Sequence, residues 1–247
     1  MKKVSVIIEA RMTSSRLPGK VLMEINKKPV LWYLIRRLKK IKRINNIILA
    51  TTTNKEDDEL VNLAKKNKIK FYRGSEHDVM QRVLFAARKF KTDIIVSITG
   101  DCPIIDHNLV SQCLNSFLKN NVDYLSNSNI RSYPDGMDVQ VYNYQALRKS
   151  YSLARSMEDK EHVTLHIRKN PNKFKILNIV APSELHYPNL GLTLDYYQDF
   201  ILIRKLINFF NKKKNYYFTC EDILKIYKKN KFFFKINKKM KRNVVQI

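Results

Sequence analysis

Strand-like and helix-like segments alternate over the first half of this 247-residue chain. Apolar runs predict strands, and apolar residues that recur every three or four positions predict helices. The strands are expected at 4–9, 46–51, 69–72 and 93–99, and the helices at 30–38, 58–66, 79–87 and 108–118. Strand–helix units in series join parallel strands. The pattern therefore predicts an α/β fold, a mostly parallel Rossmann-like sheet with helices on both faces.

Polar segments follow these strands. They lie at 10–20, 51–54, 73–78 and 100–106. In open α/β sheets, ligands bind beyond the carboxyl ends of the strands. We therefore expect the functional site at this edge of the sheet.

The segment Ala10–Lys20 reads A-R-M-T-S-S-R-L-P-G-K and carries three cations, three hydroxyls and one glycine. Such a loop can wrap a polyphosphate, because hydroxyls and main-chain N–H groups donate hydrogen bonds while Arg and Lys offset the charge. A basic surface turn is the alternative. The segment matches neither the Walker loop nor G-x-G-x-x-G.

Two aspartates are candidate metal ligands. Asp101 follows the apolar run 96–100, and Asp195 ends a predicted last strand at 192–195. Carboxylates at neighbouring strand ends could share a Mg²⁺, which prefers a few protein oxygens together with water and substrate phosphates. The alternative makes each aspartate a helix cap or a loop carboxylate.

The alternation breaks in the second half. Strands are expected at 138–142, 174–179 and 192–195, and helices at 144–153, 160–169, 200–210 and from Thr219 to Ile226. We expect a single domain over 1–247, with 127–188 as a smaller α/β excursion and 212–247 as a basic C-terminal helix and tail.

The formal net charge of +25 makes a polyanion, such as a nucleic acid, a candidate binding partner. The basic residues are spread along the chain rather than set among stacking aromatics, so no specific nucleic-acid partner is expected. The basic tail is expected to give only a weak attraction to anionic surfaces. No apolar run is long enough to cross a bilayer, and three widely spaced cysteines suggest a reducing cytoplasm.

The motifs together resemble a known family. The first loop is followed in order by A-T-T at 50–52, R-G-S at 73–75, G-D-C-P at 100–103 and L-D-Y-Y-Q-D-F at 194–200. This order resembles the CTP-dependent sugar-acid cytidylyltransferases, which include the CMP-Kdo and acylneuraminate synthetases. The segments Y-P-D-G-M-D-V-Q-V at 133–141 and E-H-V-T at 161–164 are similar to the spore-coat polysaccharide F branch.

The resemblance implies a nucleotidyltransferase that moves a cytidylyl group from CTP to a hydroxyl of an acidic sugar, releases pyrophosphate, and serves surface-polysaccharide or glycan biosynthesis. It implies Mg²⁺ as cofactor and a cytoplasmic homodimer. The implied catalytic residues are Arg11, Lys20, Asp101 and Asp195, of which the two aspartates would be metal ligands. The implied nucleotide-binding residues are Ala10, Arg11, Ser14, Ser15, Arg16, Lys20, Thr51, Thr52, Thr53, Arg73, Ser75, Thr99 and Gly100. The implied acceptor-binding residues are Asp135, Asp138, Glu161 and His162.

Some questions stay open at this point. CMP-Kdo synthetases carry Gln-Gly-Asp where this chain has Thr99-Gly100-Asp101, so cytosine recognition is open. The alternative to acceptor binding for Asp135 and Asp138 is that they cap a turn. Two other function classes remain: a glycosyltransferase, which usually has an Asp-x-Asp motif that this chain lacks, and a non-enzymatic polyanion-binding protein, which only the charge favours.

Overall fold

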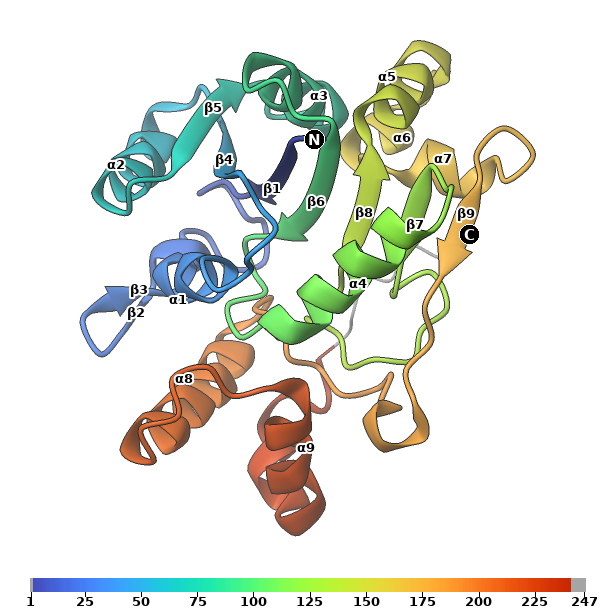
Figure 1. Cartoon of the computed structure of the whole chain (residues 1–247). Coiled ribbons are helices and arrows are strands. Elements are labelled where there is room, and N and C mark those ends of the chain that lie inside the picture. The colour runs from blue at the N-terminus through green and yellow to red at the C-terminus, as the bar shows by residue number, and fades with distance from the viewer. Residues whose placement is uncertain (1, 241–247) are drawn as a thin grey trace.

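The computed structural model describes residues 2–240. Within them, the central sheet has seven strands in the order β5-β4-β1-β6-β8-β7-β9 (Figure 1). The strands are β1 Val4–Glu9, β4 Asn46–Thr52, β5 Lys70–Gly74, β6 Ile94–Thr99, β7 Tyr124–Ser126, β8 Gln140–Asn143 and β9 Ile176–Asn178. Strands β5, β4, β1 and β6 are mutually parallel, while β8 is antiparallel to both of its neighbours.

Helices cover both faces of this sheet. They are α1 Val30–Leu38, α2 Asp58–Lys66, α3 Val79–Lys89, α4 His107–Lys119, α5 Tyr144–Leu153, α6 Met157–Glu161, α7 Leu165–Lys169, α8 Tyr197–Lys212 and α9 Cys220–Lys229. Apolar residues of α1, α2, α4, α8 and α9 join one hydrophobic core, and those of α3, α5 and α7 join the other. The 3₁₀ turns are η1 Lys20–Leu22, η2 Lys55–Asp57, η3 Ser183–Leu185 and η4 Lys231–Asn237, and a small hairpin pairs β2 Glu24–Ile25 with β3 Lys28–Pro29.

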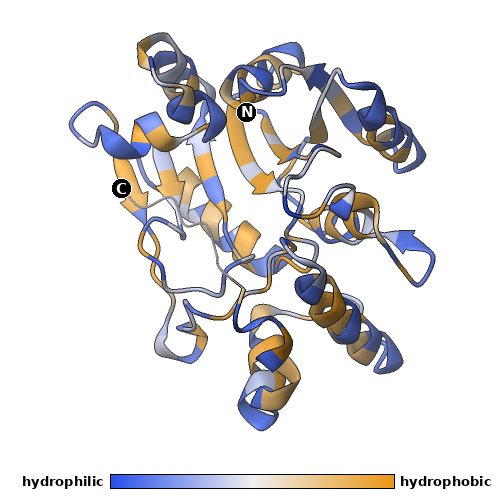
Figure 2. Ribbon diagram, turned by 180° about the vertical axis from the view of Figure 1, so that it is seen from behind, coloured by the Kyte–Doolittle hydropathy of each residue, from blue (hydrophilic) through white to orange (hydrophobic). Residues whose placement is uncertain are grey.

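Strand β1 shows why the sheet is buried on both sides. Val4, Val6 and Ile8 belong to one core and Ile7 to the other, and all four side chains are buried. A parallel strand covered on both faces needs this continuous apolar run. Figure 2 shows the same pattern, with apolar strands at the centre and polar residues on the outer sides of the helices.

The predicted α/β fold with helices on both faces is confirmed. Helices α1, α2 and α5 have the predicted bounds, and the hydroxyl of Thr219 caps α9 by accepting from the N–H of Asp222 at 3.2 Å. The sequence analysis missed β7 and the β2–β3 hairpin, which are only two or three residues long.

Two predictions were wrong. The helix expected at 160–169 is two short helices, α6 and α7, because the backbone of His162 leaves the helical region. The strand expected at 192–195 does not form. Its neighbour Gly191 makes one isolated bridge to Asp135, and Asp195 lies in the connection to α8 rather than at a strand end.

Candidate active site

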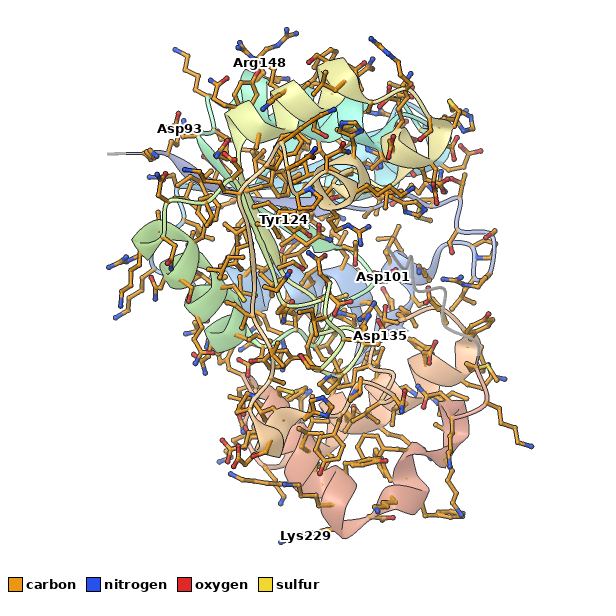
Figure 3. All side chains as sticks on the ribbon, turned by 90° about the vertical axis from the view of Figure 1, so that its right-hand side faces the viewer. Asp93, Asp101, Tyr124, Asp135, Arg148 and Lys229 are labelled. Carbon is orange, nitrogen blue, oxygen red and sulfur yellow. The ribbon has the colours of Figure 1, made fainter. Side chains whose placement is uncertain are left out.

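A cavity of about 500 Å³ opens beyond the carboxyl ends of β1 and β6. Most of the residues that sequence reasoning selected line it. These are Ala10, Arg11, Ser14, Ser15, Arg16, Lys20, Thr99, Gly100, Asp101, Asp135, Asp138, Glu161, His162 and Asp195. Figure 3 shows Asp101 and Asp135 close together at this edge of the sheet.

The centre of the cavity is a cluster of two cations and two carboxylates. The Nζ atom of Lys20 lies 2.8 Å from Asp101 Oδ2 and 3.0 Å from Asp195 Oδ1. Arg16 Nη2 lies 2.6 Å from the same Asp195 oxygen. The predicted pair of aspartates therefore meets at one point, although only Asp101 follows a strand.

The contacts within the cluster determine the protonation states of Lys20 and Asp195. Burial favours the neutral form of Lys20, but the carboxylates of Asp101 and Asp195 outweigh it, so the pKa of Lys20 is raised. Burial likewise acts to raise the pKa of Asp195, and Lys20 with Arg16 overcomes it, so that pKa is lowered. Both side chains are therefore charged at neutral pH.

Close backbone contacts bring Asp195 to Asp101. Gly100 has no room for a side chain, because a Cβ there would lie 2.8 Å from the Cβ of Ala10. The next residue, Asp101, accepts the N–H of Leu194 at 2.8 Å through its carbonyl, and its carboxylate accepts the hydroxyl of Thr99 at 2.6 Å. The backbone bond between Leu194 and Asp101 holds the 192–195 segment next to the end of β6, although this segment forms no strand.

A carboxylate on α8 holds the backbone at Asp195. Asp199 Oδ2 accepts the N–H groups of Asp195 at 3.0 Å and Tyr196 at 2.9 Å. Its other oxygen accepts Asn237 Nδ2 at 2.7 Å, and the same amide nitrogen donates to the carbonyl of Gly191 at 3.0 Å. Sequence reasoning missed both supports. Asp199 had a signal, since it is the third residue of α8 in a capping-box position. Asn237 had none.

The carboxylate of Asp57 anchors the loop Ala10–Lys20 to the 51–52 segment through hydrogen bonds. Asp57 Oδ1 accepts the N–H of Met12 at 2.8 Å, while Oδ2 accepts the hydroxyls of Thr51 at 2.7 Å and Thr52 at 2.6 Å. Burial acts to raise the pKa of Asp57, but these hydrogen bonds to the ionised carboxylate lower it on balance. Sequence reasoning missed Asp57, which has only its place at the start of α2 as a signal.

This arrangement also locates the residues predicted to bind ribose and cytosine. Thr51 and Thr52 are buried against Asp57 and do not line the cavity, while Thr53 is exposed on the adjoining loop. Their contact with a nucleotide stays a prediction.

Arg73, on β5, supports the 51–54 loop, and Ser75, just after β5, supports the turn before α3. The Arg73 guanidinium donates to the carbonyls of Thr52 at 2.8 Å and Asn54 at 2.7 Å and pairs with Asp58. The hydroxyl of Ser75 accepts the N–H of Asp78 at 3.0 Å. In this structure both side chains therefore brace backbone, and nucleotide binding by them also stays a prediction.

Glu76 joins the loop Ala10–Lys20 to the 51–54 loop, beside Arg11, which lines the cavity. Its carboxylate lies 3.3 Å from Arg11 Nη1, accepts Asn54 Nδ2 at 2.7 Å and accepts the hydroxyl of Thr13. The hydroxyl of Thr13 and the amide of Asn54 lower the pKa of Glu76. Arg11 is therefore already oriented by an acid at the mouth of the cavity.

A second cavity of about 220 Å³ adjoins the first. Arg131 Nη1 lies 3.0 and 2.9 Å from the two carboxylate oxygens of Asp138, and 3.7 Å from Asp135 Oδ1. Burial raises the pKa of Asp138 even though Arg131 opposes the shift. Glu161 and His162 line both cavities, so all four predicted acceptor-binding residues lie around this junction or beside it.

A family comparison identifies the architecture. A family model described as cytidylyltransferase matches residues 5–240. The match extends beyond the last sequence motif, at 194–200, and includes α9 and η4. None of the helices among the described residues is long and apolar enough to span a membrane.

Individual proteins agree with the family match. An uncharacterized protein of Methanocaldococcus jannaschii is 38% identical over 209 residues, which are 85% of this chain and 85% of that protein. The spore coat polysaccharide biosynthesis protein SpsF of Bacillus subtilis is 32% identical over 212 residues, or 83% of this chain and 87% of SpsF.

Solved structures share the fold. A cytidylyltransferase from Leptospira borgpetersenii serovar Hardjo-bovis superposes with a TM-score of 0.89 at 32% identity, covering 99% of this chain and 100% of that one. A CMP:2-keto-3-deoxy-manno-octonic acid synthetase complexed with CTP superposes with a TM-score of 0.60 at 18% identity, covering 84% of this chain and 99% of that one. At that identity the likeness shows a common fold.

Proposed function

This chain belongs to the cytidylyltransferase family and is a nucleotidyltransferase, and from that premise we propose that it transfers the cytidylyl group of CTP to a hydroxyl of an acidic sugar, with release of pyrophosphate. The similarity to SpsF supports a role in surface-polysaccharide or glycan biosynthesis. The cluster of Arg16, Lys20, Asp101 and Asp195 at the cavity carries the proposal. Neither a glycosyltransferase nor a non-enzymatic polyanion binder accounts for the family match.

The loop Ala10–Lys20 would hold the triphosphate. Arg11, Arg16 and Lys20 present cations toward one cavity, and Ser14 and Ser15 add hydroxyl donors. Charge-assisted hydrogen bonds to phosphate oxygens are about twice as strong as neutral ones. Nucleotidyl transfer needs positioning and charge neutralisation more than a covalent protein group. Because carboxylates already orient Arg16 and Lys20, the phosphates would meet cations whose side chains are ordered in advance.

Asp101 and Asp195 fit the requirements of a magnesium ion. Both place a carboxylate oxygen within 3.0 Å of the same Lys20 nitrogen, so they lie close enough together to share one cation. Mg²⁺ commonly takes one or two carboxylates and completes its shell with water and substrate phosphates. No group of three or more acidic, histidine or cysteine ligands occurs among residues 2–240, which also favours this mode over an all-protein metal cage. When bound, the ion would neutralise charge on the phosphates.

The acceptor would enter from the second cavity. Asp138, Glu161 and His162 line both cavities and Asp135 lines the first, so an acceptor hydroxyl at this junction would face the α-phosphorus. Arg131 holds Asp138 in place. The family resemblance further supports a homodimer and a cytoplasmic location, and both remain proposals.

A nucleotide panel tests the proposal. We expect CTP with Mg²⁺ to raise the melting temperature more than ATP or GTP does, because ligand binding to the native state stabilises it. We also expect pyrophosphate release from CTP and Mg²⁺ with at least one of a panel of acidic sugars. Equal shifts for the three nucleotides would argue against a cytidine site, and no pyrophosphate with any acid would argue against the transfer reaction.

A further inference from the structure

The last part of the described chain carries a high density of positive charge. Between residues 228 and 239 the sequence has six lysines and no acidic residue. All six side chains are exposed, and they are Lys228, Lys229, Lys231, Lys235, Lys238 and Lys239. Glu184, an exposed acid on η3, interacts with Lys228 and offsets part of this charge. The surface that these lysines form, which we call the η4 surface, therefore attracts anions.

An exposed phenylalanine lies among these lysines. The run Phe232-Phe233-Phe234 belongs to η4, and its three members differ in burial. Phe234 is buried in the hydrophobic core and Phe233 is half-buried, whereas Phe232 is 77% exposed, the largest exposed fraction among the large apolar side chains of residues 2–240. A single exposed apolar residue is ordinary. What surrounds Phe232 therefore decides whether it marks a binding surface.

The geometry of η4 places Phe232 on the same face as two of the lysines. Side chains three residues apart in a 3₁₀-helix lie above one another, so Phe232 shares its face with Lys235 and, just after the helix, with Lys238. The Nζ atom of Lys235 lies 5.4 Å from the centre of the Phe232 ring. The ring of Phe234 packs against Tyr227 with 5.1 Å between ring centres. One ring thus anchors η4 to the protein while another faces solvent.

A cavity of about 410 Å³ lies beside this face, between η4 and the 186–191 segment. Its walls include the rings of Tyr187, Tyr227 and Phe234, and Lys231, Lys235 and Lys238 line it as well. None of the described residues that line it is acidic. Aromatic walls with ammonium groups beside them suit an anionic headgroup that is attached to an apolar body.

We propose that the η4 surface docks on an anionic lipid bilayer, with the Phe232 ring inserted among the headgroups and the lysines paired with lipid phosphates. Interfacial binding of this kind combines buried apolar area with attraction to anionic lipids. Lysine stems lie along the apolar boundary while their ammonium groups stay at the phosphates. Nucleic acid fits less well, because single strands stack on several successive aromatic rings, and on the described part of this surface one ring protrudes.

Docking at this surface does not involve the proposed active site. The described residues that line the active-site cavity include none from α9 or η4. Figure 3 shows Lys229 at the opposite end of the molecule from Arg148, and away from Asp101. The proposal is therefore independent of the reaction that the enzyme catalyses.

Co-sedimentation with vesicles tests the docking surface. Partition coefficients are measured on vesicles of phosphatidylcholine alone and of phosphatidylcholine mixed equally with phosphatidylglycerol. The test variants are Phe232→Ser, Phe232→Trp and the triple variant Lys231→Gln, Lys235→Gln and Lys238→Gln. The charge-matched control replaces three exposed lysines on α2, α3 and α4, as Lys66→Gln, Lys89→Gln and Lys119→Gln. The apolar control is Met157→Ser, because Met157 is 63% exposed on α6.

We expect wild type to bind the mixed vesicles roughly 10- to 100-fold more strongly than phosphatidylcholine, with a difference that shrinks as salt is added. Phe232→Ser should weaken this binding roughly 10-fold, and the triple η4 variant should weaken it roughly 100-fold. Both controls should stay within about threefold of wild type.

Phe232→Trp reports on insertion directly. It should bind as wild type does, and its fluorescence emission should shift to shorter wavelength on the mixed vesicles, over an unchanged contribution from Trp32, the one tryptophan of the chain. The CTP-induced rise in melting temperature should be the same in every variant, which shows that each one is folded.

Several results would overturn the proposal. Equal binding to the two kinds of vesicle would exclude an anionic bilayer, and wild-type binding by Phe232→Ser would exclude insertion. Equal losses in the two triple variants would show that net charge, rather than the η4 surface, attracts the vesicles. Without vesicle binding, binding of glycerol 3-phosphate would assign the cavity to a soluble anion, and Phe232-dependent binding of single-stranded RNA would assign the surface to nucleic acid.

Discussion

Two basic regions of the molecule carry the same kind of charge in different settings. In the loop Ala10–Lys20, the ammonium of Lys20 touches two carboxylates and the side chain of Arg16 touches one. At the end of α9 and just after η4, Lys229, Lys238 and Lys239 are exposed. Figure 3 shows Lys229 at the outer edge of the molecule, away from Asp101.

This comparison shows that the number of positive charges is a separate property from how many of them are held in fixed positions. An exposed lysine is screened by salt, whereas a cation ordered by buried acids keeps one position and one protonation state. The +25 net charge is mostly a property of the surface. The chemistry is expected from the few cations that have carboxylate partners, and five variants test this contrast.

The largest effect is expected from Asp101→Asn and Asp195→Asn. Each change keeps the size of the side chain but removes a charge that orients Lys20 and would bind the metal. We expect kcat for pyrophosphate release to fall by about 100-fold or more at saturating CTP and Mg²⁺. Circular dichroism would confirm that both variants fold. Activity close to wild type in either variant would remove that aspartate from the site.

Lys20→Ala should have the next largest effect. Removing a charge-assisted contact in a partly dehydrated site costs about 1.5–3 kcal/mol, which corresponds to a loss of roughly 10- to 150-fold in kcat/KM for CTP. Steady-state kinetics with CTP as the varied substrate would measure this loss. An unchanged kcat/KM would mean that the organised cation is not a phosphate contact.

Asp57→Asn tests whether CTP binding requires the loop Ala10–Lys20 to be anchored by Asp57. We expect an increase of several-fold in KM for CTP, because the N–H of Met12 loses a charged acceptor, and a loss of about 1–3 kcal/mol in unfolding free energy at pH 7. The lowered pKa of Asp57 stabilises the wild type above the ordinary aspartate pKa of about 4, and this contribution disappears as the pH falls through the lowered value. The stability difference between wild type and variant should therefore shrink in acid.

Urea denaturation at pH 7 and near pH 3 would measure that difference. A gap in unfolding free energy that stays constant between the two pH values would show that the ionised form of Asp57 does not supply the stability.

The smallest effect is expected from the triple variant Lys229→Gln, Lys238→Gln and Lys239→Gln. Its kcat/KM for CTP should stay within about twofold of wild type at physiological salt, because these charges are screened. Its binding to anionic vesicles should weaken and lose salt dependence. Lys241, which also belongs to the basic tail, lies outside the described residues. A triple variant that lost turnover while Lys20→Ala kept it would reverse the roles of the two regions.

The sequence was sufficient where local periodicity decides structure. Strands β1, β4, β5 and β6 and helices α1, α2 and α3 between them were predicted to within two residues, because each strand is an apolar run and each helix has one apolar face. The first cavity was also foreseen, since parallel strand ends meet at one edge. Of the residues selected for it, those on the first loop and after β6 were gathered there.

Contacts between segments that are far apart in the chain could not be predicted from the sequence. Asp195 was placed on a strand because L-T-L precedes it, but isolated hydrogen bonds hold that segment instead of a strand ladder. The N–H of Leu194 and the hydroxyl of Thr193 donate to the carbonyl of Asp101, and the N–H of Leu192 donates to the carbonyl of Asp135. Asp57 has only its place at the start of α2 as a local signal, and Asn237 has none. Each acts through a partner or a cavity that exists only after distant segments have come together.

The bond from Asn237 to Asp199 has a consequence for how the protein is made. Chains emerge from the ribosome N-terminus first, and their domains form as the segments become available. The loop Ala10–Lys20 and Asp101 are therefore delivered early, while the amide that secures the backbone around Asp195 arrives with η4. A chain stopped before η4 would contain every strand of the sheet and both carboxylates, yet its active site would lack this last fastening. In the order of translation, the support of the backbone at Asp195 is therefore complete only after η4 has been made.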